Sequence, residues 1–107
     1  MQIEMVTKEE LLTMLNNLDV IVLNVLPRDW YEQAHIKGSI SIPLEELPNH
    51  LNCLSKDKLI ITYCASYECT SCIEAAELLA NYGFNVKVYR GGTKEWIEAG
   101  LPWESST

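Results

Sequence analysis

The chain has 107 residues and a formal net charge of −7, from 15 acidic and 8 basic residues. Hydrophobic residues make up 48 % of it, which argues against intrinsic disorder, and the length predicts one domain over residues 1–107. The basic residues are scattered and no apolar run approaches the ~20 residues that span a bilayer, so we expect neither nucleic-acid nor membrane binding.

The N-terminal part of the chain predicts a strand, a helix and a second strand. Residues 3–6 alternate weakly and predict a short edge strand. Thr7 and Glu10 have the spacing of a capping box, which predicts a helix with one apolar face. Residues 20–25 show little alternation, as expected of a parallel strand covered on both faces, and Pro27 ends this run.

Three shorter elements follow. Asp29 and Glu32 resemble the cap of a short helix over residues 30–35. Residues 39–42 predict a third strand, and residues 44–51 predict an irregular helix.

A strand, a loop and a helix are predicted in the middle of the chain. Residues 59–63 form an apolar, β-branched run that ends abruptly at Cys64. After a loop of small and polar residues, a helix that stops near Gly83 turns one stripe of small residues towards the sheet. The stripe consists of Cys72, Ala75, Ala76 and Leu79.

The last predicted elements are a strand over residues 86–89 and a helix that Thr93 caps and that ends at Ala99. Gly100 and the following Leu-Pro are expected to end the fold. Strands that alternate with helices predict an α/β fold. We expect a mostly parallel sheet of five strands with helices on both faces.

Cys64 is the candidate nucleophile. It lies where the central strand meets its loop, and ligands of open α/β sheets gather at such strand ends. The following helix directs backbone N–H groups towards the loop, and a helix N-terminus lowers the pKa of a thiol and favours the reactive thiolate. The alternative is a core cysteine at the end of a strand.

The other cysteines suggest several roles. Cys69 and Cys72 have the Cys-x-x-Cys spacing of a thioredoxin-type couple, but Cys72 lies on the stripe that faces the sheet, so we interpret it as buried and structural. Cys69 is either a resolving thiol, a partner in a loop disulfide, or inert. We expect mild oxidation to link Cys64 with Cys69, because Cys72 is too buried to compete. Cys53 has no motif and is expected to pack in the core.

No metal or organic cofactor is expected, because the cysteines of the loop lack a fourth ligand at an obvious zinc spacing. Four cysteines in a chain of this length do not form a disulfide scaffold and fit a reducing compartment. The acidic N-terminal segment has no signal-peptide pattern, so a cytoplasmic location is expected.

Three stretches resemble a single-domain rhodanese, with a variant and longer active-site loop. They are His35-Ile-Lys-Gly-Ser-Ile-Ser-Ile-Pro-Leu, then Ile60-Ile-Thr-Tyr-Cys64, and Tyr89-Arg-Gly-Gly-Thr-Lys-Glu-Trp-Ile-Glu-Ala-Gly-Leu-Pro. The resemblance implies a rhodanese-like three-layer fold around a central parallel sheet. It also implies sulfur transfer through a persulfide on Cys64, from a small sulfur donor to a thiol or protein acceptor. The oligomeric state is left open. The loop implied to bind the substrate consists of Ala65, Ser66, Tyr67, Glu68, Cys69 and Thr70.

The sequence departs from the family pattern around this loop. Asn24 stands where the family has an aspartate at a strand end, so we interpret it as structural. Ala65 and Tyr67 occupy places that usually hold an arginine and a glycine, and Glu68 adds a negative charge. We therefore expect thiosulfate to be a weak donor. His35 lies in a connection and is expected to make a structural hydrogen bond.

Two other functions are consistent with the same residues. One is a non-catalytic rhodanese-like module that binds or regulates a partner, in which Cys64 is idle. The other is a thiol–disulfide reductase that uses Cys69 and Cys72.

Overall fold

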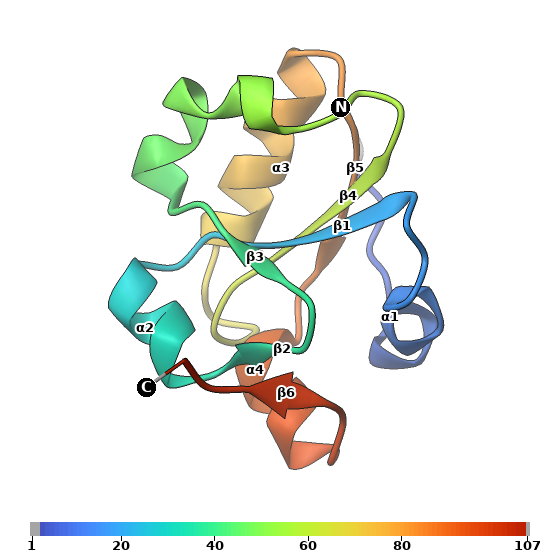
Figure 1. The fold of residues 1–107 in the computed structure, drawn as a ribbon, viewed down its shortest axis with the longest axis vertical. Helices are drawn as coiled ribbons and strands as arrows, with labels where there is room; N and C mark the ends of the chain where they lie inside the picture. The colour runs from blue at the N-terminus through green and yellow to red at the C-terminus, as the bar shows by residue number, and fades with distance from the viewer. Residues whose placement is uncertain (1–2, 107) are drawn as a thin grey trace.

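The computed structural model describes residues 3–106 of the chain. Its central sheet is parallel, with strands in the order β3-β1-β4-β5 (Figure 1). β4 lies inside the sheet and pairs along its whole length with β1 and β5. The strands are β1 (Val20–Asn24), β3 (Ile40–Ser41), β4 (Leu59–Tyr63) and β5 (Asn85–Tyr89).

The fifth strand expected over residues 3–6 is reduced to a single parallel bridge between Met5 and Val88. The Val6 N–H donates to the Val88 carbonyl at 2.9 Å, and the Val88 N–H donates to the Glu4 carbonyl at 3.0 Å. The segment therefore follows the outer edge of β5 without extending the sheet to five strands.

Helices cover both faces of the sheet. α3 and the 3-10 helix η1 pack on one face, and α1 and α4 pack on the other (Figure 1). The expected α/β fold with a mostly parallel sheet is confirmed. The helices are α1 (Lys8–Met14), α2 (Arg28–Gln33), α3 (Ser71–Asn81) and α4 (Gly92–Glu98), with 3-10 helices η1 (Leu44–Asn49) and η2 (Leu51–Cys53).

Neighbouring residues of each strand enter opposite cores. Leu23 and Ile60 belong to the core under α3, whereas Val22 and Ile61 belong to the core under α1 and α4. Full burial of each such side chain stabilises the fold by ~1.5–3 kcal/mol. A strand with two buried faces has no polar face, which explains why β1 and β4 show little alternation.

Local signals place the ends of α1 and α3. The Thr7 N–H donates to Glu10 Oε1 at 2.9 Å and the Glu10 N–H donates to Thr7 Oγ1 at 3.1 Å, which confirms the capping box. α3 ends at Asn81, and Gly83 follows with φ of +87°, a conformation that glycine adopts without strain. The prediction that this helix stops near Gly83 is therefore confirmed.

The segment after β1 differs from the expectation. α2 begins at Arg28, and Pro27 precedes it without a side-chain hydrogen bond, so the predicted cap of Asp29 and Glu32 is wrong. The fixed φ of proline suits the start of a helix, and this places the helix before residue 30.

A small second sheet was not predicted. β2 (His35–Ile36) pairs antiparallel with β6 (Trp103–Glu104), so the fold continues beyond Pro102 (Figure 1). Two-residue strands carry no periodic pattern, which is why only the tertiary structure reveals them. Within residues 3–106, no helix is long and apolar enough to cross a membrane.

Candidate active site

Cys64 lies where the sequence places it, directly after β4 and ahead of α3. Its side chain is fully buried. The backbone of Cys72, in the first turn of α3, lies near enough to the Cys64 sulfur to act on its pKa, in the direction that lowers it. The sulfur therefore lies at the N-terminus of a helix, as the strand–loop–helix pattern predicts.

The start of α4 holds the first residues of the loop. The Thr93 N–H donates to the Cys64 carbonyl at 3.0 Å, and the Lys94 N–H donates to the Ala65 carbonyl at 2.9 Å. Gly92 makes this approach possible, because a Cβ at this residue would lie 2.5–2.7 Å from backbone atoms of residues 64–66. The Gly-Gly pair of the closing motif thus positions the cysteine loop.

The middle of the loop forms a tight turn. The Cys69 N–H donates to the Ser66 carbonyl at 3.1 Å. The Ser66 hydroxyl donates to Glu68 Oε2 at 2.8 Å, and this bond lowers the pKa of the exposed Glu68 carboxyl. Thr70 then precedes α3, and its carbonyl accepts hydrogen bonds from the N–H groups of Ile73 and Glu74. The loop therefore presents a carboxylate to solvent.

Arg90 contacts the loop from the neighbouring strand and was missed by the sequence reasoning. Its guanidinium donates to the Tyr67 carbonyl. Arg90 directly follows β5, whose carboxyl end lies beside that of β4, and this placement was the available signal. The loop itself contains no arginine, but Arg90 lies next to it and binds the loop backbone.

Three thiols gather at the base of the loop. The Cys64 thiol donates to the Cys69 carbonyl at 3.5 Å, and the Cys72 thiol lies 4.0 Å from the same oxygen. The side chains of Cys69 and Cys72 both act on the pKa of Cys64. Cys72 is fully buried as expected, but it is buried beside Cys64, which is equally buried. The expectation that burial separates these two thiols is therefore wrong.

The pKa values of this thiol cluster differ from the expectation. The hydrogen bond with Cys72, followed by burial, raises the pKa of Cys64 instead of lowering it. The same hydrogen bond lowers the pKa of Cys72, and the charge of Arg90 acts in the same direction. Two thiols that share a proton titrate as a pair. The pair therefore releases its first proton more easily than its second.

Cys53 is exposed, so the prediction that it packs in the core is wrong. It belongs to the last turn of η2, away from the thiol cluster. Among residues 3–106, no three histidine, cysteine or acidic side chains are arranged to hold a metal ion.

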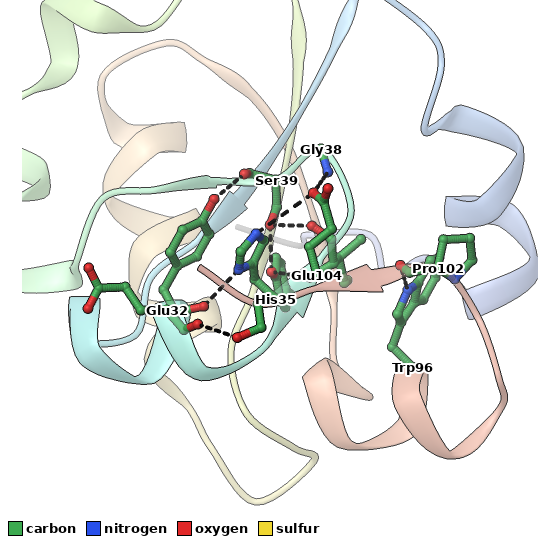
Figure 2. Close-up of polar contacts among 11 residues, drawn as sticks. Glu32, His35, Gly38, Ser39, Trp96, Pro102 and Glu104 are labelled. Atoms are coloured by element: carbon green, nitrogen blue, oxygen red, sulfur yellow. Dashed lines mark hydrogen bonds and ion pairs between the residues drawn. The ribbon is translucent and has the colours of Figure 1, made fainter. Parts of the chain in front are cut away.

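His35 has a structural position, as expected. Its Nδ1 donates to the Tyr31 carbonyl at 2.7 Å, and its ring stacks on Tyr31 with centroids 3.9 Å apart. Figure 2 shows His35 beside Glu104 of β6, with 3.9 Å between His35 Nε2 and Glu104 Oε1. The same close-up shows Trp96 directed at the Pro102 carbonyl, which accepts its indole N–H at 2.6 Å. These contacts attach the C-terminal segment to the body of the fold.

Asn24 is fully buried at the end of β1. Its Oδ1 accepts the Leu26 N–H at 2.9 Å and so shapes the turn that leaves the strand. This contact agrees with the structural role that the sequence suggested.

Ser66 of the loop lines two pockets. One of about 320 Å³ is lined by Trp30 of α2, by Ala65 and Ser66, and by Lys94 of α4. A second, of about 210 Å³, has Ser66 and Tyr67 in its wall. Ser66 lies between the two pockets, so the start of the loop is accessible although Cys64 is not.

Comparisons with known proteins identify the family. A model of the rhodanese-like domain matches residues 7–99. The chain belongs to the rhodanese-like family. Its structure superposes on that of the BH2092 protein from Bacillus halodurans with a TM-score of 0.91 at 30 % identity, covering 96 % of this chain and 77 % of that one. The family resemblance and the fold predicted from the sequence are thus confirmed.

The names of two curated relatives point to different functions. The HTH-type transcriptional regulator Rv0324 of Mycobacterium tuberculosis is 35 % identical over 97 residues, which is 91 % of this rhodanese-like chain and 43 % of the regulator. This chain thus spans less than half of that regulator. The thiosulfate sulfurtransferase GlpE of Coxiella burnetii is 29 % identical over 80 residues, covering 73 % of this chain and 72 % of GlpE. The family match and the likeness to GlpE support a sulfurtransferase-type family.

Proposed function

We propose that this rhodanese-like protein is a sulfurtransferase that passes a sulfane sulfur through a persulfide on Cys64. The observation that carries the proposal is the position of Cys64, which directly follows the interior strand β4 and lies beside the start of α3, where the Cys72 backbone acts to lower its pKa. Backbone N–H groups fixed in this way favour negative charge on the sulfur as it develops. The named activity of GlpE supports the same reaction class.

The transfer takes place in two displacements. The Cys64 thiolate attacks the sulfane sulfur of the donor, the donor's sulfur–sulfur bond breaks, and the donor leaves with the bonding electron pair. An acceptor thiolate then attacks the outer sulfur of the persulfide, and Cys64 leaves as a thiolate. The net change is the movement of one sulfur atom, with no metal or organic cofactor involved.

The surroundings of Cys64 can supply the nucleophile. Cys64 must lose its proton to attack, and the Cys69 side chain and the Cys72 backbone both act to lower its pKa and so favour the thiolate. Burial keeps Cys64 protonated until a donor is in place, which limits side reactions with solvent oxidants.

The surface of the loop favours some donors over others. Glu68 is exposed, and the guanidinium of Arg90 is engaged by the Tyr67 carbonyl. A dianion such as thiosulfate therefore meets negative charge without a free arginine, and the net charge of −7 adds to the repulsion. We propose persulfide or polysulfide donors, a thiol or protein acceptor, and the cytoplasm as the setting, where thiols stay reduced.

Intact-mass spectrometry after incubation with polysulfide, glutathione persulfide or thiosulfate tests the proposal. The wild-type chain should gain the mass of one sulfur atom, and peptide mapping should place it on Cys64. Cys64→Ser should gain none there. Cys53→Ser is the matched control, because Cys53 is exposed and lies outside the cluster, so it reports non-specific labelling. If the sulfur is found on Cys53 alone, the sulfurtransferase proposal fails.

The second candidate is a binding or regulatory module. It is favoured by the likeness to a transcriptional regulator of which this chain covers only 43 %. It predicts that no donor modifies Cys64 in the folded protein, although the thiol reacts once the chain is unfolded. The same mass measurement, repeated in denaturant, separates the two functions.

A further inference from the structure

We propose that Cys72 is a second reactive thiol, which displaces sulfide from persulfidated Cys64 and closes a Cys64–Cys72 disulfide. The protein would then act as a persulfide reductase as well as a transferase. This inference rests on the proposed function, since Cys64 must first carry the sulfur.

The two side chains share one buried environment. Both are fully buried and belong to the core under α3. Both thiols face the Cys69 carbonyl oxygen, at 3.5 Å from Cys64 and 4.0 Å from Cys72, and each acts on the pKa of the other. The Cys72 thiol therefore lies close to the Sγ of Cys64, which is the inner sulfur once a persulfide forms.

Cys72 is held in this position by the sheet. The Thr62 hydroxyl donates to the Cys72 carbonyl at 2.8 Å, which attaches the first turn of α3 to β4. Cys69 also acts on Cys64, but it lies on the loop, in the turn that its N–H closes on the Ser66 carbonyl. A donor can reach the buried Cys64 only if this loop moves, and Cys69 then moves with it. Cys72 stays beside Cys64, so it is the better placed resolving thiol.

The chemistry balances without an external oxidant. The Cys72 thiolate attacks the inner sulfur of the Cys64 persulfide, a sulfur–sulfur bond forms between the two cysteines, and the bond to the outer sulfur breaks. The outer sulfur leaves with the electron pair as hydrosulfide. The sulfane sulfur is reduced, and the two cysteines are oxidised to a disulfide. A dithiol reductant restores them for the next turnover.

The outcome at Cys64 then depends on competition. When an acceptor thiol arrives first, the sulfur is transferred intact. When none arrives, Cys72 releases it as sulfide and the buried disulfide leaves Cys64 without a free thiol. The protein would thus transfer sulfur only when an acceptor is bound.

The test compares Cys72→Ala with the matched variant Cys69→Ala. Each protein is reduced, freed of reductant, treated with a limiting amount of inorganic polysulfide and desalted. Sulfide release, intact mass and a non-reducing peptide map are then measured without added thiol. Thermal melting of each variant shows whether it is folded. Oxidation of the wild type with diamide, followed by the same map, tests the 64–72 pairing without any substitution.

The proposal expects wild type and Cys69→Ala to release sulfide and to contain a 64–72 link. Cys72→Ala should keep a persulfide on Cys64 and lose most of the sulfide release. A lasting persulfide in the wild type, or a dominant 64–69 link, would overturn the role of Cys72. A dominant 69–72 link would favour the thioredoxin-like reductase instead. Failure of Cys64 to gain sulfur even in Cys72→Ala would refute the sulfurtransferase itself, which is a distinct result.

Discussion

The backbone of Gly92 lies directly against that of Cys64. A Cβ at Gly92 would lie 2.5 Å from the Cys64 carbonyl oxygen, and φ of Gly92 is +70°. The N–H of the next residue, Thr93, donates to the same oxygen at 3.0 Å. The start of α4 and the start of the cysteine loop therefore form one rigid unit.

We predict that Gly92→Ala destabilises the protein and impairs sulfur transfer. The positive φ alone costs ~1–2 kcal/mol for a residue with a Cβ, and the overlap with the loop adds ~1–3 kcal/mol. Gly100→Ala is the matched control, because Gly100 has φ of +74° but no atom within 4 Å of the added Cβ. Chemical denaturation measures both variants. Equal losses of stability would show that the overlap is unimportant.

The Arg90 guanidinium is predicted to hold the loop closed. Arg90→Met removes the hydrogen bond to the Tyr67 carbonyl and should lower stability by ~1.5–3 kcal/mol, the usual effect of a bond to a charged group. Cys64 should then react faster with iodoacetamide in the folded protein. The control is Arg28→Met, because Arg28 binds Glu46 and the Ser41 carbonyl instead. Unchanged alkylation in Arg90→Met would mean that another contact closes the loop.

Asn24 is predicted to contribute to stability and not to catalysis. Asn24→Ala leaves the buried Leu26 N–H without its acceptor and should cost ~1–3 kcal/mol. Asn17→Ala removes a bond of the same kind, from the Asp19 N–H to Asn17 Oδ1 at 2.8 Å, but at the surface, and should cost less. Thermal melting and sulfur-transfer rates per folded molecule measure both effects. An Asn24→Ala protein that is stable but inactive would contradict the structural role.

Glu68 is predicted to disfavour anionic donors. Glu68→Arg replaces the exposed carboxylate of the loop by a guanidinium and should raise thiosulfate turnover. Glu77→Arg makes the same change of charge on an exposed position of α3 and should have little effect. Initial rates at low ionic strength compare the two. Brisk thiosulfate turnover in the unmodified protein would show that the backbone N–H groups alone suffice.

Stability is predicted to fall at alkaline pH, partly through Tyr89. Burial, followed by the 2.7 Å hydrogen bond to Glu95, raises the pKa of Tyr89 above the ordinary value of ~10. A raised pKa favours the neutral phenol in the folded state, so its contribution is present below pH ~10 and is lost as the pH rises further. Tyr89→Phe should therefore show a shallower alkaline loss than wild type.

Tyr82→Phe is the control for this experiment, because Tyr82 is 53 % exposed. Melting temperatures of the three proteins between about pH 8 and pH 11 measure the effect. Parallel curves for wild type and Tyr89→Phe would assign the alkaline loss to other groups.

The sequence alone determined those elements whose signals come from residues close together in the chain. The capping box of Thr7 and Glu10, the uninterrupted apolar run of β4 and the stop at Gly83 are local signals, because the interacting groups lie close together in the chain. The same locality placed Cys64 between β4 and α3. The closing motif then supported the family resemblance that the comparison confirms.

The tertiary structure alone decided which groups meet at the site. The hydrogen bond of Arg90 to the loop, the pairing of β2 with β6 and the shared environment of Cys64 and Cys72 join residues from different elements. The sequence correctly made Cys72 a buried residue of α3. It could not show that Cys64 is buried beside it, because burial depends on how the loop folds over the sheet. The directions of their pKa shifts follow from that contact and from desolvation, so they are properties of the packed structure and not of the spacing.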